Sequence, residues 1–327
     1  MSGFDKDTTT DEVLDGLDLS GRRIVITGTS SGLGLETARA MASKGGAITM
    51  LARSVEKNEA AASRVREQVP GVDLETREID LTSFESVRAC AEGILEAHDK
   101  IDILINNAGV MVCPYSTNAD GFENQLVSNH LGHFLLSVLL TPALIRGAPA
   151  RVVELSSGAH GMSDFDFDDP NFAHREYNPW VAYGQSKTAN ALFALEYNRR
   201  LSDRGVSAYS VHPGVIMTEL GRHMTEETMQ QMFDHVRAAA EASGESLPDA
   251  PPAIAYKTVE AGAATQCWAA TASELDGQGG KYLADCQVAI VGGDTSERGV
   301  MPYARDPEAA RKLWTLSENW VGQKLEA

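Results

Sequence analysis

The chain has little that would point to nucleic acid, a membrane or a secretory route. Its 327 residues contain 28 Lys and Arg against 46 Asp and Glu, and the net charge of −18 disfavours nucleic acid and anionic membranes as partners. No run of about 18 apolar residues occurs, so no membrane insertion is expected. Residues 1–20 are polar and acidic, without an apolar signal core, and predict a polar N-terminal tail on a cytoplasmic protein.

Cysteine and histidine give no pattern typical of a metal site. The four cysteines form no CxxC pair, and Cys90 and Cys267 fall in helical apolar patterns that predict core thiols in a reducing compartment. His130 and His133 share a predicted helix, but no third ligand accompanies them. The aspartates of residues 164–169 lack the glycine and glutamate of a calcium loop. No metal is expected.

Short apolar strands alternate with helical patterns along most of the chain. The expected strands are 23–27, 47–51, 73–80, 101–106, 151–156 and 207–212. The expected helices are 33–43, 54–69, 83–98, 118–146 and 180–203. This alternation predicts a single α/β domain over residues 21–327, with a Rossmann-like doubly wound parallel sheet and helices on both faces. Residues 158–179 and 218–257 break the alternation and are predicted to form substrate loops.

A glycine-rich segment follows the first expected strand and opens the first helix. Residues 27–34 read TGTSSGLG. Glycines allow a tight turn and a close approach of backbone N–H groups to a pyrophosphate at the helix N-terminus. The spacing is not the usual G-x-G-x-x-G, so a purely structural glycine turn remains an alternative. The candidate phosphate-binding residues are Gly28, Ser30, Ser31, Gly32, Leu33 and Gly34.

Residues that follow the next strands predict the rest of a dinucleotide site. Arg53 stands where NAD-binding proteins prefer an acid, and its guanidinium can pair with a 2′-phosphate, so NADP(H) is expected with NAD(H) as the alternative. A solvated arginine would fit equally. Asp80, followed by Leu81, either accepts from the adenine amino group or caps the next helix. The small and amide residues of the fourth strand end can pass close to the cofactor ribose; they are Asn107, Ala108 and Gly109.

Tyr183 and Lys187 form a candidate acid–base pair. They stand four residues apart on one expected helix and therefore share a face. A nearby ammonium favours the phenolate and brings the tyrosine pKa toward a useful range. Ser157, at a strand end, either holds a substrate oxygen or caps a helix. Asn129 lies inside a helical pattern, where asparagine is unfavourable, and predicts a backbone or water contact.

The order of these motifs resembles the short-chain dehydrogenase/reductase family. The matching segments are TGTSSGLG, Asp80-Leu81, NNAG, VSNHLGHF, RVVELSS, YGQSK and VHPGVIMTEL, which cover roughly residues 21–215. Within the family, NHLGHFLL, LSSGAH and the segments GGKYLADC and PYARDPEAARKLW are similar to the retinol dehydrogenase and WW-domain oxidoreductase branch. The resemblance implies about seven parallel strands, the last near residues 280–283. It also implies that Pro213, Gly214 and Thr218 border the nicotinamide, with Val215 as a further cofactor-binding residue.

The resemblance further implies an NADP(H)-dependent oxidoreductase that interconverts an alcohol and a carbonyl by hydride transfer. Tyr183 would be the acid–base, Ser157 would polarise the substrate oxygen, Lys187 would hold the ribose and Asn129 would position a water. A C=C reductase and a non-catalytic NADP-binding sensor of the same fold remain alternatives.

Two expectations concern partners. Apolar residues of the candidate pocket loops predict a small hydrophobic substrate, although they fit simple loop packing equally. They are Met111, Val112, Phe165, Phe167, Phe172, Trp180, Met217, Met229, Met232 and Phe233. The resemblance also implies a possible homodimer or homotetramer, because members of the family often pair through the helices that carry the residues matching Asn129 and Tyr183. Apolar positions that allow this pairing, and equally allow packing on the sheet, are Ala189, Ala191, Leu192 and Leu195.

Overall fold

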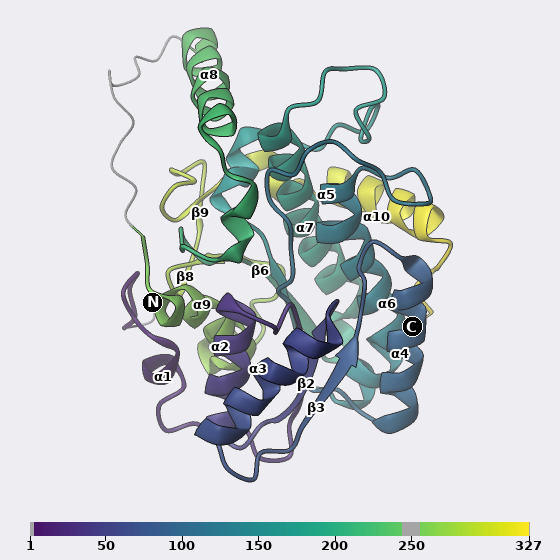
Figure 1. Cartoon of the computed structure of the whole chain (residues 1–327), viewed down its shortest axis with the longest axis vertical. Helices are drawn as coiled ribbons and strands as arrows, with labels where there is room; N and C mark the ends of the chain where they lie inside the picture. The colour runs from purple at the N-terminus through teal and green to yellow at the C-terminus, as the bar shows by residue number, and fades with distance from the viewer. Residues whose placement is uncertain (1–2, 244–255, 327) are drawn as a thin grey trace.

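One central sheet organises the chain in the computed structural model, which describes residues 3–243 and 256–326 (Figure 1). Its strands are β1 (Arg23–Thr27), β2 (Ala47–Ala52), β3 (Leu74–Glu78), β4 (Ile103–Asn106), β5 (Ala150–Leu155), β6 (Val206–His212), β7 (Tyr282–Ala284) and β8 (Gln287–Val288). They lie in the order β3-β2-β1-β4-β5-β6-β7-β8, and all neighbours pair in parallel except β7 and β8. The doubly wound parallel sheet is confirmed. The antiparallel edge strand β8 is an addition that the sequence did not indicate.

Helices cover both faces of the sheet, as predicted. They are α1 (Thr10–Val13), α2 (Gly32–Ser43), α3 (Val55–Gln68), α4 (Phe84–Ala97), α5 (Asn124–Leu126), α6 (Gly132–Arg146), α7 (Pro179–Leu201), α8 (Glu226–Ser243), α9 (Val259–Thr271) and α10 (Pro307–Val321). One buried apolar cluster joins α4, α6, α7 and α10 to the sheet, and a second joins α1, α2, α3 and α9. Along β1, Val25 belongs to the first cluster and Ile24 and Ile26 to the second, because successive strand side chains point to opposite faces.

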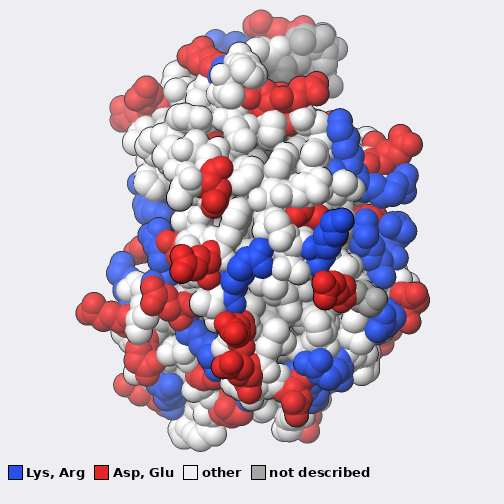
Figure 2. Space-filling model, turned by 90° about the vertical axis from the view of Figure 1, so that its right-hand side faces the viewer, with Lys and Arg blue, Asp and Glu red and all other residues white. Residues whose placement is uncertain are grey.

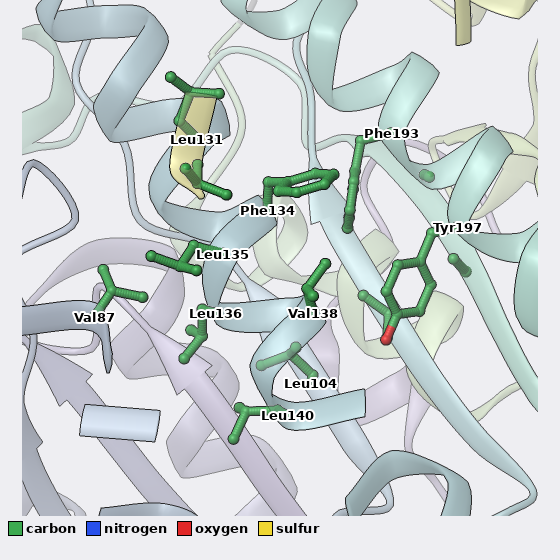
Figure 3. Close-up of a cluster of buried hydrophobic side chains, with 14 of the residues drawn as sticks. Val87, Leu104, Leu131, Phe134, Leu135, Leu136, Val138, Leu140, Phe193 and Tyr197 are labelled. Carbon is green, nitrogen blue, oxygen red and sulfur yellow. The ribbon is translucent and has the colours of Figure 1, made fainter. Parts of the chain in front are cut away.

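Aromatic contacts fix α7 against α6 and α10. Figure 3 shows Phe134 of α6 facing Phe193 of α7 within the first cluster. Their ring centroids are 5.8 Å apart in an edge-on arrangement, and Phe193 stacks on Trp314 of α10 at 5.9 Å. Such pairs add specific geometry to the burial of large apolar surfaces. Because α7 also carries Tyr183 and Lys187, the same contacts hold these two side chains in place.

The N-terminal residues fold onto the domain, which differs from the polar tail expected for residues 1–20. Thr9 caps α1 reciprocally with Glu12, and α1 packs on α2 and α9. Leu14 is completely buried, and Val13 and Leu19 are nearly so. Because the segment is mostly polar, its composition did not indicate that these three apolar side chains belong to the second cluster. Residues 3–20 of the described chain are therefore part of the domain.

The helix expected over residues 118–146 begins at Asn124 and is interrupted. A π-helical turn, Val127–Leu131, lies between α5 and α6. The whole stretch Asn124–Arg146 is long and apolar enough to cross a membrane by length and composition, although it contains no uninterrupted run of about 18 apolar residues. In this fold, however, 83% of its most apolar window is buried inside the domain. The stretch is a core helix between α4 and α7.

The two predicted substrate loops differ in structure. Residues 158–162 form a 3₁₀ turn, whereas the following residues turn away to pack elsewhere, with Phe165 in the first cluster. Two of the aspartates in this loop face Arg175, whose Nε lies 3.5 Å from Asp166 and 3.8 Å from Asp169. In the second loop, α8 projects from the body of the molecule (Figure 1). Residues 244–255 of this predicted loop lie outside the described residues.

On the face that Figure 2 shows, acidic and basic side chains are interspersed. The core thiols predicted at Cys90 and Cys267 are buried. No group of three or more potential metal ligands occurs among the residues that the structure describes.

Candidate active site

A cavity of about 1310 Å³ opens at the carboxyl ends of the central strands. Its wall includes the segments that follow β1, β2, β4, β5 and β6, together with parts of α7 and α8. Ligands bind at this edge in doubly wound sheets, because the order of the strands reverses there between β1 and β4. The cavity therefore occupies the position that the fold provides for a dinucleotide.

The glycine-rich segment takes the conformation that a phosphate loop needs. Gly28 has φ +74° and Gly32 has φ +56°, in the left-handed region that favours glycine. A Cβ on Gly28 would meet the Ala108 Cα at 2.8 Å, and one on Gly34 would collide with the Gly28 carbonyl oxygen. The glycines thus allow the first helix to start directly against the loop that follows β4.

The N-terminus of α2 is open toward the cavity. Its N-cap residue, Ser31, makes no side-chain hydrogen bond to the helix, whereas side chains cap α3, α4, α7, α9 and α10. The first N–H groups of a helix need partners, and together with the helix dipole they favour an anion. Uncapped donors beside a glycine turn fit the pyrophosphate of a dinucleotide.

Most of the predicted cofactor-binding residues line this one cavity. They are Gly28, Ser30, Ser31, Gly32, Leu33, Arg53, Asp80, Leu81, Asn107, Ala108, Gly109, Tyr183, Lys187, Pro213, Gly214, Val215 and Thr218. Gly34 is the exception, because it is buried beneath Gly28 and shapes the turn from below. The structure thus brings together residues separated by up to 190 positions in the sequence, from Gly28 to Thr218.

Two exposed cations border the end of the cavity near β2. Arg53 follows β2 and Lys57 lies one turn into α3, and both line the wall. In the described part of the chain no carboxylate forms an ion pair with either side chain. Asp80 lies nearby, with its Oδ1 accepting from the backbone and hydroxyl of Thr82, so one of its oxygens serves the turn before α4. Sequence reasoning missed Lys57, although its spacing of four residues from Arg53 would have indicated it.

Ser157, Tyr183 and Lys187 converge on the middle of the cavity. Ser157 follows β5, and its Oγ accepts the Ala159 N–H at 3.2 Å, which leaves the hydroxyl proton to donate. Lys187 Nζ lies 5.8 Å from the centre of the Tyr183 ring and donates to the Leu155 carbonyl at 2.8 Å. Tyr183 and Lys187 therefore lie on one face of α7, as their spacing predicts, and both side chains line the cavity.

Burial governs the protonation of these groups. It raises the pKa of Tyr183 to about 12, against a smaller lowering by the Ser157 hydrogen bond. Burial lowers the pKa of Lys187 to about 8, while the Glu154 carboxyl opposes that shift. Glu154 is itself buried, which raises its pKa well above the usual range despite a hydrogen bond from Asn106. A buried cation and a buried acid thus lie beneath the cavity.

Asn129 lies under the cavity wall rather than in it. Its side chain is fully engaged, since Oδ1 accepts the Val110 N–H at 2.8 Å and Nδ2 donates to the Val110 carbonyl and the Ser186 hydroxyl, each at 2.9 Å. The backbone contact predicted from its position in the helix is therefore present. Asn129 stands in the π turn, a feature often found at functional sites.

The other end of the cavity is apolar and rich in methionine. Its wall contains Met111, Met162, Trp180, Met217, Met224, Met229 and Met232. Trp180 donates its indole N–H to the Thr228 carbonyl of α8 at 2.7 Å, and His235 of α8 lies 3.0 Å from the Met162 carbonyl. These contacts attach α8 to the rim. Met162 and Met224 were missed, because no pattern in their segments distinguishes them from ordinary loop residues.

Half of the apolar pocket residues predicted from the sequence do not reach the cavity. Those outside its wall are Val112, Phe165, Phe167, Phe172 and Phe233. Phe165 and Phe167 pack edge to face, with ring centroids 4.9 Å apart, against the first cluster, and Phe172 packs on Tyr177 at 5.1 Å. Their loop gains more from burial in the core than from lining a solvent-filled cavity. For these residues the alternative of loop packing was correct.

The apolar positions considered for a subunit interface are buried within the chain. Ala189, Ala191 and Leu192 have no exposed surface, and Leu195 is half-buried. Helix α10 packs along α7, with Trp314 on Phe193. Their burial needs no second copy, and a homodimer or homotetramer stays a prediction.

Comparison with known proteins agrees with this geometry. The family model described as short chain dehydrogenase matches residues 22–229. Human retinol dehydrogenase 12 is 40% identical over 95% of this chain and 89% of its own length, and a probable oxidoreductase of Streptomyces lividans is 41% identical over 91% and 97%. A solved structure of an uncharacterised protein from Mycobacterium paratuberculosis covers 96% of this chain and 98% of its own, with 32% identity and a TM-score of 0.73. The chain therefore belongs to the short-chain dehydrogenase/reductase family of NAD(P)-dependent oxidoreductases, in which it is similar to the retinol dehydrogenases.

Proposed function

We propose that the chain interconverts an apolar alcohol and its aldehyde or ketone, with NADP(H) as cofactor and Tyr183 as the proton donor and acceptor. The observation that carries the proposal is the position of Tyr183, Ser157 and Lys187 between a cationic and an apolar end of one cavity. When bound, the nicotinamide supplies or accepts the hydride. The residues of the chain then need to supply a proton and to orient the substrate oxygen.

Tyr183 holds its proton at neutral pH because burial keeps its pKa at about 12. It can therefore donate that proton to a carbonyl oxygen as the hydride arrives. The Ser157 hydroxyl, whose proton is not used within its turn, donates to the same oxygen. The Lys187 ammonium stabilises the phenolate that remains, and with a pKa of about 8 it carries its charge below that pH. Carbonyl reduction is accordingly expected to slow as the pH rises above about 8.

The preference for NADP(H) is supported by Arg53 and Lys57. Both are exposed at the end of the cavity where the adenosine ribose would lie, and no acidic side chain of the described residues pairs with them. A planar guanidinium binds a phosphate through two hydrogen bonds, and an ammonium adds a second positive charge. An acid that would prefer the free 2′-hydroxyl of NAD is absent from the end of β2, which reads Leu51-Ala52-Arg53.

The substrate class is supported by the methionines and Trp180 around the apolar end. Methionine adapts its shape and suits an elongated apolar ligand. Relatives of this chain are named retinol dehydrogenase, so retinaldehyde is one suitable probe beside simple aldehydes such as octanal.

The cofactor assignment is tested by fluorescence titration of the wild type and Arg53→Ala with NADPH and NADH. We expect NADPH to bind more tightly, and Arg53→Ala to weaken NADPH binding on the order of tenfold while NADH binding changes little. Arg66→Ala is a matched control, because Arg66 lies on the neighbouring helix α3 but pairs with Glu59 outside the cavity. Equal or tighter binding of NADH by the wild type would overturn the NADP(H) assignment.

A further inference from the structure

His133 is a buried side chain on α6 that the proposed chemistry does not use. Only 1% of its surface is exposed, and it does not belong to the wall of the active-site cavity. Its two ring nitrogens nevertheless face two segments of the site. Nε2 lies 2.9 Å from the Thr27 hydroxyl at the end of β1, and Nδ1 lies 3.0 Å from the backbone carbonyl of Asn129.

The direction of each hydrogen bond follows from the donors around Thr27. Thr27 Oγ1 accepts the backbone N–H groups of Asn107 and Ala108, each at 2.9 Å, so its own proton remains to be donated. That proton goes to His133 Nε2, which therefore accepts. Nδ1 must then carry the ring proton and donates it to the Asn129 carbonyl. The neutral ring agrees with burial, which lowers the pKa of His133 to about 3.

A second acceptor lies near the same ring nitrogen. Glu154 Oε1 is 3.8 Å from His133 Nδ1, which is beyond hydrogen-bond distance. The other carboxyl oxygen, Oε2, accepts from Asn106 at 2.8 Å. Burial raises the pKa of Glu154, which weakens the attraction of its carboxyl for the ring proton. The imidazole is therefore held by Thr27 and Asn129.

These bonds join His133 to both ends of the loop formed by residues 107–110. One end is held through Thr27, which binds the backbone of Asn107 and Ala108. The other end is held at Val110 by the side chain of Asn129, whose carbonyl His133 binds. Between them, a Cβ on Gly109 would lie 3.2 Å from Asn129 Oδ1 and 3.7 Å from Lys187 Nζ. The loop is thus packed directly against the amine of Lys187.

We propose that His133 is a positioning residue that fixes the loop of residues 107–110 relative to Asn129 and Lys187. The proposal rests on the proposed function, since it concerns the geometry in which Lys187 and the cofactor ribose would meet. Without the imidazole, the Thr27 hydroxyl and the Asn129 carbonyl lose their common partner. The loop and the π turn that carries Asn129 can then shift independently, although no atom that touches the substrate is removed.

The test compares three variants of the full chain. His133→Phe removes both polar contacts at similar size, and His133→Gln keeps one donor and one acceptor. His130→Phe is the matched control, because His130 is equally buried and close by in the same helical stretch, but bonds to Ser317 of α10 at 2.9 Å, away from the cavity. The measurements are kcat and KM for octanal, the dissociation constant of NADPH and the thermal midpoint.

We expect His133→Phe to lower kcat on the order of tenfold to hundredfold, with KM for octanal nearly unchanged. The dissociation constant of NADPH should rise on the order of threefold. His133→Gln should recover much of both losses. His130→Phe should lower the thermal midpoint by a similar amount yet leave kcat and NADPH binding close to those of the wild type.

Two outcomes decide the proposal. If His133→Phe matches His130→Phe in kcat and in NADPH binding, or if the glutamine variant recovers nothing, His133 has only a structural role and the proposal is overturned. If the wild type reduces no aldehyde or ketone, the proposed function fails instead. The positioning role is then decided by the dissociation constant of NADPH alone, which does not depend on turnover.

Discussion

Buried histidines make the stability of this fold sensitive to mild acid. Burial lowers the pKa of His130, His133 and His212 to about 3, whereas an unfolded chain protonates histidine near its ordinary value of 6.5. Between these two values the unfolded state binds more protons than the folded state. The stabilising contribution of each neutral, buried ring is therefore complete above about pH 6.5 and is lost as the pH falls toward 3.

The magnitude follows from the linkage relation. As the pH falls through this window, each histidine lowers the free energy of unfolding by about 1.4 kcal/mol per pH unit, or by about 2 kcal/mol between pH 6.5 and pH 5. His160 shifts in the same direction. Glu154 opposes it, because its raised pKa makes the folded state bind the extra proton above pH 4.5. Glu154 therefore offsets part of the loss, and about 2 kcal/mol from a single histidine by pH 5 is already a substantial part of a typical domain stability of about 5–15 kcal/mol.

His130→Phe isolates one of these contributions. Its direct cost, from the lost Ser317 hydrogen bond, is the same at every pH. The difference in unfolding free energy between pH 8 and pH 5 should be smaller than in the wild type by about 2 kcal/mol. Urea unfolding followed by tryptophan fluorescence measures this difference. An identical difference in variant and wild type would refute the reasoning, because His130 would then have the same pKa in both states.

Two further substitutions test the geometry of the fold. Gly34→Ala should abolish cofactor binding and lower the thermal midpoint, because the added Cβ would lie 2.5 Å from Asn107 Nδ2 and would collide with the Gly28 carbonyl. Gly221→Ala is the control and should be tolerated, because a Cβ there would have only Met224 within 4 Å, at 3.8 Å. Asp102→Ala should reduce the unfolding free energy by roughly 2–4 kcal/mol, because the buried carboxylate accepts the Arg23 N–H at 2.8 Å and pairs with Lys100 at 3.0 Å. Urea unfolding with unchanged stability would exclude this role for Asp102.

The sequence was sufficient for the sheet and for the residues at its carboxyl edge. Gly28, Asn107 and Ser157 follow expected strands and Tyr183 lies on the helix after the fifth strand, and parallel strands bring their carboxyl ends to one edge. The order of strands and motifs, together with the family resemblance, therefore placed these four residues together. The expected face of α7 also followed from spacing alone, because residues four apart on a helix point the same way.

The remaining features depend on tertiary contacts that local patterns do not carry. The π turn at Asn129 is one inserted residue within a helical pattern, and it is stabilised by Val110 and His133 from other turns or loops. The N-terminal segment reads as polar because few apolar side chains attach it to the domain, namely Val13, Leu14, Leu19 and the partly buried Phe4. Phe165 and Phe167 are apolar loop residues like those that line the cavity, so the sequence does not distinguish them from pocket residues. Only the structure shows that they pack on the core instead.

The central claim is that the Tyr183 hydroxyl transfers the proton. The most direct measurement compares Tyr183→Phe with Tyr197→Phe in the oxidation of NADPH by octanal, followed by absorbance. Tyr197 is a matched control, because it is also buried on α7 but its hydroxyl bonds to Thr141 at 2.8 Å, outside the cavity. The account predicts that Tyr183→Phe loses on the order of 10²–10⁴ in kcat with NADPH binding retained, while Tyr197→Phe stays active. A Tyr183→Phe enzyme as fast as the wild type would contradict it.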